Sequence, residues 1–237
     1  MTKLLYLDDS YLKETTAKIA SIQEIEDNKV ITLDQTIFYP KGGGQPTDKG
    51  KVIKDGQEYN VLEVYKYQDN VYHVLDNTNS LNIGDEVILK LDWNRRYRLM
   101  KMHTAAHIIC KIINQKTGAL ITGNQLDVEK SRIDFNLENY DKEQIISFFD
   151  DINNILKQNL DITTDYIDRN NAPENLTFLA KGLPESIKKI RFVKIGDIDI
   201  QADGGTHIKN TSEINKIIFL KSDNKGKSNR RLYFTLE

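Results

Sequence analysis

The sequence contains a single cysteine, Cys110, and no long apolar run. A lone cysteine excludes an internal disulfide and is consistent with a reducing compartment. No segment approaches the roughly 18 consecutive apolar residues that a membrane-spanning helix needs. The N-terminus turns acidic at Asp8 and Asp9 before a signal-like apolar stretch develops. These absences predict a cytoplasmic protein, and the length of 237 residues predicts one or two domains.

A strong excess of charge of one sign is also lacking. The formal net charge is −2, which excludes a general nucleic-acid binder of the strongly basic kind. Basic residues nevertheless gather in three places, which are Arg95, Arg96, Arg98 and Lys101; Lys188, Lys189, Arg191 and Lys194; and Lys221, Lys225, Lys227, Arg230 and Arg231. Each cluster can bind phosphates or form an ordinary solvated face, and sequence alone favours the second interpretation.

Histidine is scarce as well, but three of the four histidines stand in two short motifs. His103-Thr-Ala-Ala-His107 lies in a stretch, 93–116, whose apolar spacing predicts a helix, so both imidazoles project from one face. Asp203-Gly-Gly-Thr-His207 has the same spacing, and its glycines predict a tight loop that turns both side chains toward one point. The fourth histidine, His73, has no partner motif and is interpreted as structural.

Three imidazoles and one carboxylate form a ligand set that suits a tetrahedral zinc ion. Donor types alone also admit nickel, cobalt or ferrous iron. Cys110 is a rival ligand, but residues 103, 107 and 110 span about 10 Å of helix, which is too long for convergence on one ion. Zinc peptidases with two helical histidines carry glutamate directly after the first, whereas Thr104 stands here. A metallopeptidase is therefore disfavoured, and any catalytic base other than a metal-bound water stays unidentified.

The first part of the chain, 1–92, is rich in short alternating runs separated by turn residues, which predicts a small β-barrel or folded sheet. The expected strands are 29–33, 50–53, 59–64, 70–75 and 86–91. Between the first two lies a segment, 36–48, with three consecutive glycines, which can bring backbone amides close to a ligand or serve only as a connection. It lacks the ending of a phosphate-binding P-loop.

The second part, 93–237, has a different pattern. Asp92 is expected to cap the helix that carries the two histidines, and Gly118 to end it. A second helix is expected over 142–159. Strands are expected at 132–137, 162–167, 190–195, 216–221 and 231–236. The chain is therefore expected to be α+β, with an N-terminal barrel-like domain at 1–92 and, at 93–237, helices packed on a mostly antiparallel sheet.

With these motifs in order, the chain resembles the AlaX-type alanyl-tRNA editing proteins, freestanding relatives of the editing domain of alanyl-tRNA synthetase. The resemblance covers nearly the whole chain and is closest to the medium-sized class. It is carried by Phe38-Tyr-Pro-Lys-Gly-Gly-Gly-Gln-Pro-Thr-Asp48, Arg98-x-x-x-x-His103-Thr-Ala-Ala-His107, Thr122-Gly-Asn-Gln125, Asp203-Gly-Gly-Thr-His207 with Thr211-Ser-Glu213, and Lys225-Gly-Lys-x-x-Arg-Arg-Leu-Tyr-Phe-Thr235.

The resemblance implies a zinc-dependent deacylase that acts in trans on alanine tRNA mischarged with serine, and in some members with glycine. By position it implies that His103, His107, Asp203 and His207 hold Zn²⁺. Asp203 departs from the cysteine that the synthetase domain and many relatives carry there. Because thiolate and carboxylate have the same charge, zinc is expected to survive this exchange, with weaker affinity. Whether the metal activates water or only orients the substrate stays open.

The resemblance also implies residues for substrate and tRNA. The segment with Thr122, Asn124 and Gln125 matches the one that faces the substrate side chain in the family, although these residues can equally be turn formers. Thr104, Thr206 and Gln45 are further candidates. The expected tRNA contacts are Arg95, Arg98, Lys101, Lys225, Lys227 and Arg230. Two alternatives remain, which are a tRNA-binding module with a structural zinc and a metal-dependent hydrolase of a small ester.

Overall fold

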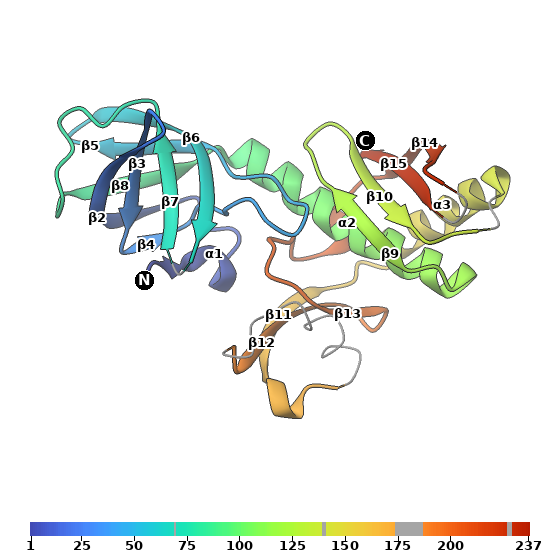
Figure 1. The fold of residues 1–237 in the computed structure, drawn as a ribbon. Coiled ribbons are helices and arrows are strands. Elements are labelled where there is room, and N and C mark those ends of the chain that lie inside the picture. The colour runs from blue at the N-terminus through green and yellow to red at the C-terminus, as the bar shows by residue number, and fades with distance from the viewer. Residues whose placement is uncertain (69, 139–140, 174–186, 227–228) are drawn as a thin grey trace. The chain divides into compact units, whose positions relative to one another are not determined.

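The structure is a computed structural model that describes residues 1–68, 70–138, 141–173, 187–226 and 229–237 (Figure 1). It divides the chain into two compact units, Met1–Met100 and Lys101–Glu237. The first two turns of the long helix α2 (Trp93–Thr117) belong to the first unit and the remainder to the second. The division of function between 1–92 and 93–237 stays a prediction.

The first unit is built on a closed antiparallel barrel with the strand order β2-β3-β7-β6-β5-β8. Its elements are β1 (Lys3–Leu4), α1 (Leu5–Asp8), β2 (Glu14–Ile25), β3 (Asn28–Leu33), β4 (Gln35–Thr36), β5 (Gly50–Lys54), β6 (Gln57–Tyr67), β7 (Asn70–Leu75) and β8 (Glu86–Leu91). The short strands β1 and β4 pair in parallel outside the barrel. The expected barrel is thereby confirmed.

Period-two alternation builds the core of the barrel. In β8 the side chains of Val87, Leu89 and Leu91 are buried, and the residues that alternate with them, Glu86, Ile88 and Lys90, are exposed. The longest strand, β2, was not expected, because polar and charged residues dominate Glu14–Ile25. Ala17 and Ile19 nevertheless alternate inward. Closure of the barrel pairs β2 with β3 on one side and with β8 on the other. The weakly hydrophobic sequence of β2 does not by itself predict this pairing.

The glycine segment forms a tight turn. The backbone N–H of Gly42 donates to Gln45 O at 3.1 Å, and the N–H of Gln45 donates back to Gly42 O at 2.8 Å. Gly43 and Gly44 have φ angles of +57° and +83°, as the two central residues of a type I′ turn require. Glycine is needed at both positions because other residues adopt this region only with strain. The backbone amides of Gly42 and Gln45 therefore bond to each other's carbonyl oxygens.

A buried ion pair joins the end of this segment to α2. The Arg96 side chain is fully buried, and its Nε donates to Asp48 Oδ1 and Oδ2 at 3.1 and 3.0 Å. Its Nη1 also donates to Ser10 O at 2.9 Å, and Nη2 to Ile37 O at 2.6 Å. Asp48 Oδ2 accepts from the N–H of Tyr39 at 2.6 Å. Arg96 belongs to a basic cluster for which the sequence favoured a solvated face, but the structure instead buries it and bonds it inside the unit.

His73 is structural, as expected, and is buried in the barrel. Its Nε2 lies 2.8 Å from Thr36 Oγ1, where the glycine segment begins. Burial, only partly opposed by the backbone of Ile31, lowers the pKa of His73 to about 4. The imidazole is therefore neutral in the folded protein at pH 7, whereas in the unfolded chain it has its ordinary pKa of about 6.5.

This difference predicts a pH-dependent stability. Between pH 6.5 and 4 the unfolded chain binds the proton and the folded barrel does not, so stability is lost as the pH falls. We expect wild type to lose about 3 kcal/mol more than His73→Gln between pH 7 and pH 4. Urea unfolding of both proteins at both pH values measures this difference in stability loss. The other titratable groups are present in both proteins, so their contributions cancel in the comparison. Equal losses would contradict the prediction.

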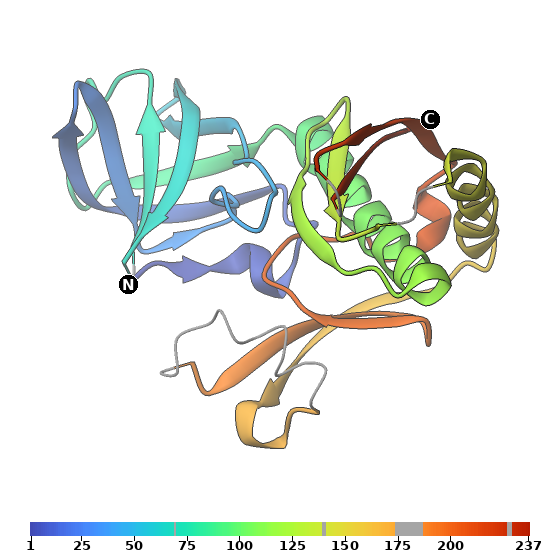
Figure 2. The same ribbon diagram turned by 45° about the vertical axis from the view of Figure 1, so that its right-hand side comes forward.

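The second unit contains two antiparallel sheets, with orders β14-β15-β10-β9 and β11-β12-β13. Its remaining elements are β9 (Ile121–Gln125), β10 (Ser131–Phe135), α3 (Lys142–Leu156), β11 (Ile162–Asp168), η1 (Arg169–Asn171), β12 (Lys189–Ile195), β13 (Asp199–Ala202), η3 (Thr211–Glu213), β14 (Ile217–Asn224) and β15 (Arg230–Leu236). Figures 1 and 2 show α2 and α3 beside the four-stranded sheet. The expected α+β class with mostly antiparallel sheets is confirmed.

The ends of α2 are as the sequence predicts. The N–H of Arg95 donates to Asp92 Oδ1 at 3.1 Å, which is an N-cap. Gly118, with φ +74°, follows the last turn and donates to Asn114 O. Every residue from Met102 to Ile109 is buried, so this part of the helix places its two histidines inside the unit.

The second helix, α3, ends at Leu156 rather than at the expected residue 159. Asn159 has a left-handed φ of +52°, which is incompatible with a continuing helix.

Among the described residues, no helix combines the length and the apolar composition needed to cross a membrane.

Candidate metal centre

Four side chains of the second unit converge on one point. His103 and His107 come from α2, and Asp203 and His207 from the loop after β13. One donor atom of each lies within 4.8 Å of the others. The Nε2 atoms of His103 and His107 lie 3.5 and 3.7 Å from Asp203 Oδ2, and that of His207 lies 3.1 Å from Asp203 Oδ1. The structure therefore brings together the four residues that the sequence predicted as ligands.

The donor set fits a divalent metal ion. The three histidines are nearly inaccessible to solvent, and the Asp203 side chain is 18% exposed. Three imidazole nitrogens face a single carboxylate, and two of them, at 3.5 and 3.7 Å from Asp203 Oδ2, lie beyond ordinary hydrogen-bond distance of it. Four nitrogen and oxygen donors at one buried point match the coordination number and the ligand types of zinc. Cys110, the rival ligand of the sequence analysis, is not part of this cluster.

Burial and mutual contact set the protonation of the cluster. Burial lowers the pKa of His207 to about 4 and that of His103 well below its usual range. Burial also acts to lower the pKa of His107, but contacts with Asp199 and Asp203 outweigh it and raise this pKa to about 9. Burial acts to raise the pKa of Asp203, yet the neighbouring imidazoles hold it well below its usual range. The carboxylate is thus ionised, as a metal ligand must be.

The loop reaches the helix because Gly205 has no side chain. A Cβ at this position would lie 2.9 Å from Asp203 Oδ1 and closer still to the His103 imidazole. The N–H of Gly205 donates to Asp203 Oδ1 at 2.5 Å. Neither Gly204 nor Gly205 has a positive φ. Close approach, rather than the backbone freedom inferred from the sequence, therefore explains why residue 205 is glycine.

Arg191 on β12 fixes the same loop. Its Nη1 donates to Asp203 O at 2.7 Å, and its carbonyl accepts from the N–H of Asp203 at 3.2 Å. The side chain is 8% exposed. The sequence placed Arg191 in a basic cluster and gave no sign of this role, because the contact depends on the pairing of β12 with β13.

The side chain of Thr104 lies behind the cluster. It is fully buried, and Oγ1 is 3.1 Å from His207 Nδ1, the ring nitrogen that faces away from Asp203. Thr206, in the loop, is also fully buried. Gln45 belongs to the first unit, where it is buried in the glycine turn.

The segment with Thr122, Asn124 and Gln125 forms β9, an edge strand of the four-stranded sheet. A strand was not expected here. Thr122 Oγ1 donates to Asn229 Oδ1 at 3.2 Å, and Gln125 Oε1 accepts from Arg132 Nε at 3.2 Å. Asn124 is half-buried and pairs with Ile133. The roles of these residues toward a substrate stay predictions.

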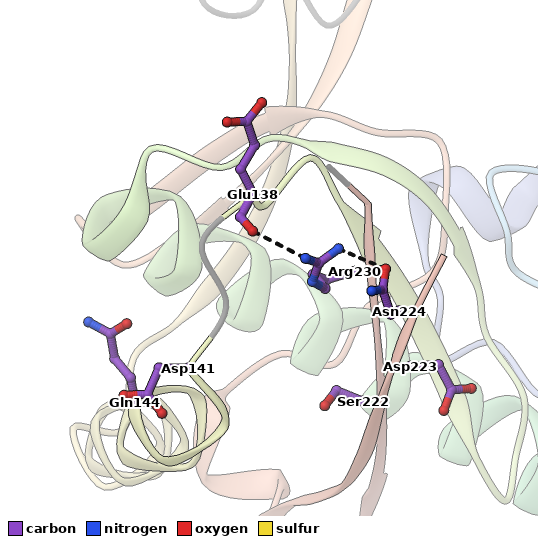
Figure 3. A pocket seen from close by; sticks show the side chains of 7 residues that line it. All are labelled: Glu138, Asp141, Gln144, Ser222, Asp223, Asn224 and Arg230. Carbon is purple, nitrogen blue, oxygen red and sulfur yellow. Dashed lines mark hydrogen bonds between the residues drawn. The ribbon is translucent and has the colours of Figure 1, made fainter. Parts of the chain in front are cut away.

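The expected tRNA contacts have different surroundings. Arg95 donates from Nε and Nη2 to Thr47 O, whereas Arg98 and Lys101 are half-buried and Lys225 is exposed. Lys227 lies outside the described residues. Arg230 donates to Asn224 Oδ1 and Glu138 O (Figure 3). It lines a cavity of about 470 Å³ together with Glu138, Asp141, Gln144, Ser222, Asp223 and Asn224. Their roles toward tRNA stay predictions.

Two family models match the chain. The one described as tRNA synthetases class II (A) matches residues 9–95. The one described as the threonyl and alanyl tRNA synthetase second additional domain matches residues 190–233, which include Asp203 and His207.

Full-length relatives match as well. The alanyl-tRNA editing protein AlaX-M of Methanosarcina barkeri is 44% identical, over 100% of this chain and 99% of its own length. AlaX-M of Saccharolobus solfataricus is 42% identical over 100% of both chains. The alanine–tRNA ligase of Sulfurisphaera tokodaii is 38% identical over 90% of this chain, a match that covers 24% of the ligase.

Proposed function

The chain belongs to the AlaX-M alanyl-tRNA editing proteins, and from this premise we propose that it removes a wrong amino acid from alanine tRNA in trans. The finer proposal is that it hydrolyses the ester of Ser-tRNA(Ala) at a zinc centre, with Gly-tRNA(Ala) as the second candidate substrate. The observation that carries it is the convergence of His103, His107, His207 and Asp203 on one buried point.

The four residues would hold the zinc ion. When bound, zinc would supply a Lewis acid that polarises an ester carbonyl and lowers the pKa of a water toward about 7. Asp203 is the most exposed member of the set, so its side is the one open to substrate. The buried histidines keep the opposite side dry, which strengthens electrostatic interactions at the reacting ester.

Selection against alanine requires polar groups that bond to the hydroxyl of serine. A site built for that hydroxyl disfavours alanine, because its own polar groups would then be left without partners. Thr122, Asn124 and Gln125 on β9 remain our candidates, and Thr206 and Gln45 come next. Arg95, Arg98, Lys101, Lys225, Lys227 and Arg230 remain candidates for contacts with tRNA phosphates.

The test is hydrolysis of Ser-tRNA(Ala) and Gly-tRNA(Ala), compared with Ala-tRNA(Ala) and Ser-tRNA(Ser). We expect the zinc-loaded protein to release serine from the alanine tRNA more than about 100-fold faster than alanine. His103→Ala and chelated wild type should lose this activity. Tight tRNA binding without hydrolysis would favour a binding module with a structural zinc. Turnover of small esters with no response to tRNA would favour the general hydrolase.

A further inference from the structure

A second buried carboxylate, Asp199, lies beside the metal centre without belonging to it. Asp199 opens β13 and is 7% exposed. Its Oδ2 lies 3.5 Å from His107 Nδ1 and accepts a hydrogen bond from Gln201 Nε2 at 2.8 Å. Burying a carboxylate is costly unless it has partners. The position of Asp199 therefore needs an explanation within the unit.

The His107 ring has two differently placed nitrogens. Nε2 faces Asp203, at 3.7 Å from Oδ2, and Nδ1 faces Asp199. Nδ1 is buried and has no hydrogen-bond partner among the described residues. The Asp199 oxygen is about 0.5 Å beyond the usual N–H···O distance, so a small shift closes the bond. No other acceptor for this nitrogen is recorded in the described part of the chain.

We propose that Asp199 is a positioning residue that accepts the Nδ1–H of His107 and thereby directs Nε2, with its lone pair, at the metal. The proposal rests on the zinc centre of the proposed function. Metal-binding histidines generally donate their second ring N–H to such a partner, which fixes the tautomer and the ring orientation. Gln201 completes the arrangement, because its side-chain amide donates a hydrogen bond to the Asp199 carboxylate and so orients it toward the His107 ring.

A second histidine of the centre has the same arrangement. His207 directs Nε2 at Asp203 Oδ1 and Nδ1 at Thr104 Oγ1, each at 3.1 Å. Its partner is a neutral hydroxyl, whereas that of His107 is a carboxylate. A carboxylate acceptor makes the imidazole the more basic ligand. Asp199 thus places a second negative charge next to a ligand set that contains only one carboxylate, Asp203.

Zinc affinity tests the proposal without relying on activity. We expect Asp199→Asn to bind zinc about 10- to 100-fold more weakly than wild type in competition with a chromophoric chelator. Asp197→Asn is the matched control, because the Asp197 side chain is 98% exposed and its ion-pair partner among the described residues is the surface residue Lys194. It should bind zinc within about twofold of wild type, as expected for a surface pair. Thermal unfolding of the metal-free variants shows whether each is folded.

Nuclear magnetic resonance of the zinc-loaded wild type provides a second readout that needs no variant. Long-range ¹H–¹⁵N correlations should show the proton of His107 on Nδ1. A proton on Nε2, or unchanged zinc affinity in a folded Asp199→Asn protein, would overturn the proposal. If wild type binds no zinc, this inference fails together with the zinc centre. Editing of Ser-tRNA(Ala) by such a metal-free protein would still leave the editing function standing.

Discussion

Replacing Gly205 by alanine is expected to reduce zinc affinity and to slow the deacylation of Ser-tRNA(Ala) by about 100-fold or more. The added methyl group would lie 2.9 Å from Asp203 Oδ1 and even closer to the His103 ring, so at least one ligand must move. A shift of the main chain would disturb two hydrogen bonds of this loop, from Gly205 N–H to Asp203 Oδ1 and from Arg191 Nη1 to the Asp203 carbonyl. Zinc titration and single-turnover deacylation measure the two effects.

Gly204→Ala is the matched control. A Cβ at Gly204 meets nothing within 4 Å, and its φ is not positive. The two variants therefore differ in what the methyl group touches and not in composition. We expect Gly204→Ala to retain zinc affinity and activity within a few-fold, as is usual for substitutions away from such contacts. Equal behaviour of the two variants would show that close approach to His103 does not determine the centre.

Replacing Asp48 by alanine is expected to destabilise the first unit by about 3–5 kcal/mol. The reason is that Arg96, which is 0% exposed, would keep its charge without its carboxylate partner. The tight turn of the glycine segment should loosen as well, because Asp48 also accepts from the Tyr39 amide. Urea unfolding followed through Trp93, the single tryptophan, which lies one turn before Arg96, measures the loss.

Two further variants separate the causes. Glu58→Ala removes the partner of Lys51, but these side chains are 50% and 43% exposed, so a loss below about 1 kcal/mol is expected. The double variant Asp48→Leu with Arg96→Met replaces the buried pair by apolar groups and should recover much of the stability. If the double variant were as unstable as Asp48→Ala, an uncompensated charge would not be the cause.

Local patterns were sufficient for most of the elements and for the ligand set. The spacing of His103 and His107, the cap at Asp92 and the stop at Gly118 are properties of consecutive residues, and the structure has all of them. The alternation in β7 and β8 predicted their bounds without error. Strands β2, β9 and β13 were missed, because their sequences are polar or short. Pairing stabilises them, with the distant β8 for β2 and with a strand next to it in the chain for β9 and for β13.

The roles of the basic and acidic residues required three dimensions. Arg96 and Arg191 stand in basic clusters for which the sequence favoured a solvated face over phosphate binding. Both are buried instead, and one pairs with Asp48 while the other holds the Asp203 carbonyl. Asp199 has no motif, since its partner His107 is 92 positions earlier in the chain. Such contacts cannot be predicted from neighbouring residues, because the local sequence around a charged residue is the same whether its side chain lies at the surface or in a buried bond.

The sequence by itself determined which donors are available, that two of them share a helical face, and that the chain resembles the alanyl-tRNA editing proteins. Only the tertiary structure decided that the loop carrying Asp203 and His207 meets that face, that Gly205 must lack a side chain, and that Asp199 and Thr104 lie behind the imidazoles. The physical reason is that periodicity and turn chemistry act between neighbours in the chain, whereas convergence of the ligands depends on contact between α2 and the loop after β13, which are far apart in the sequence.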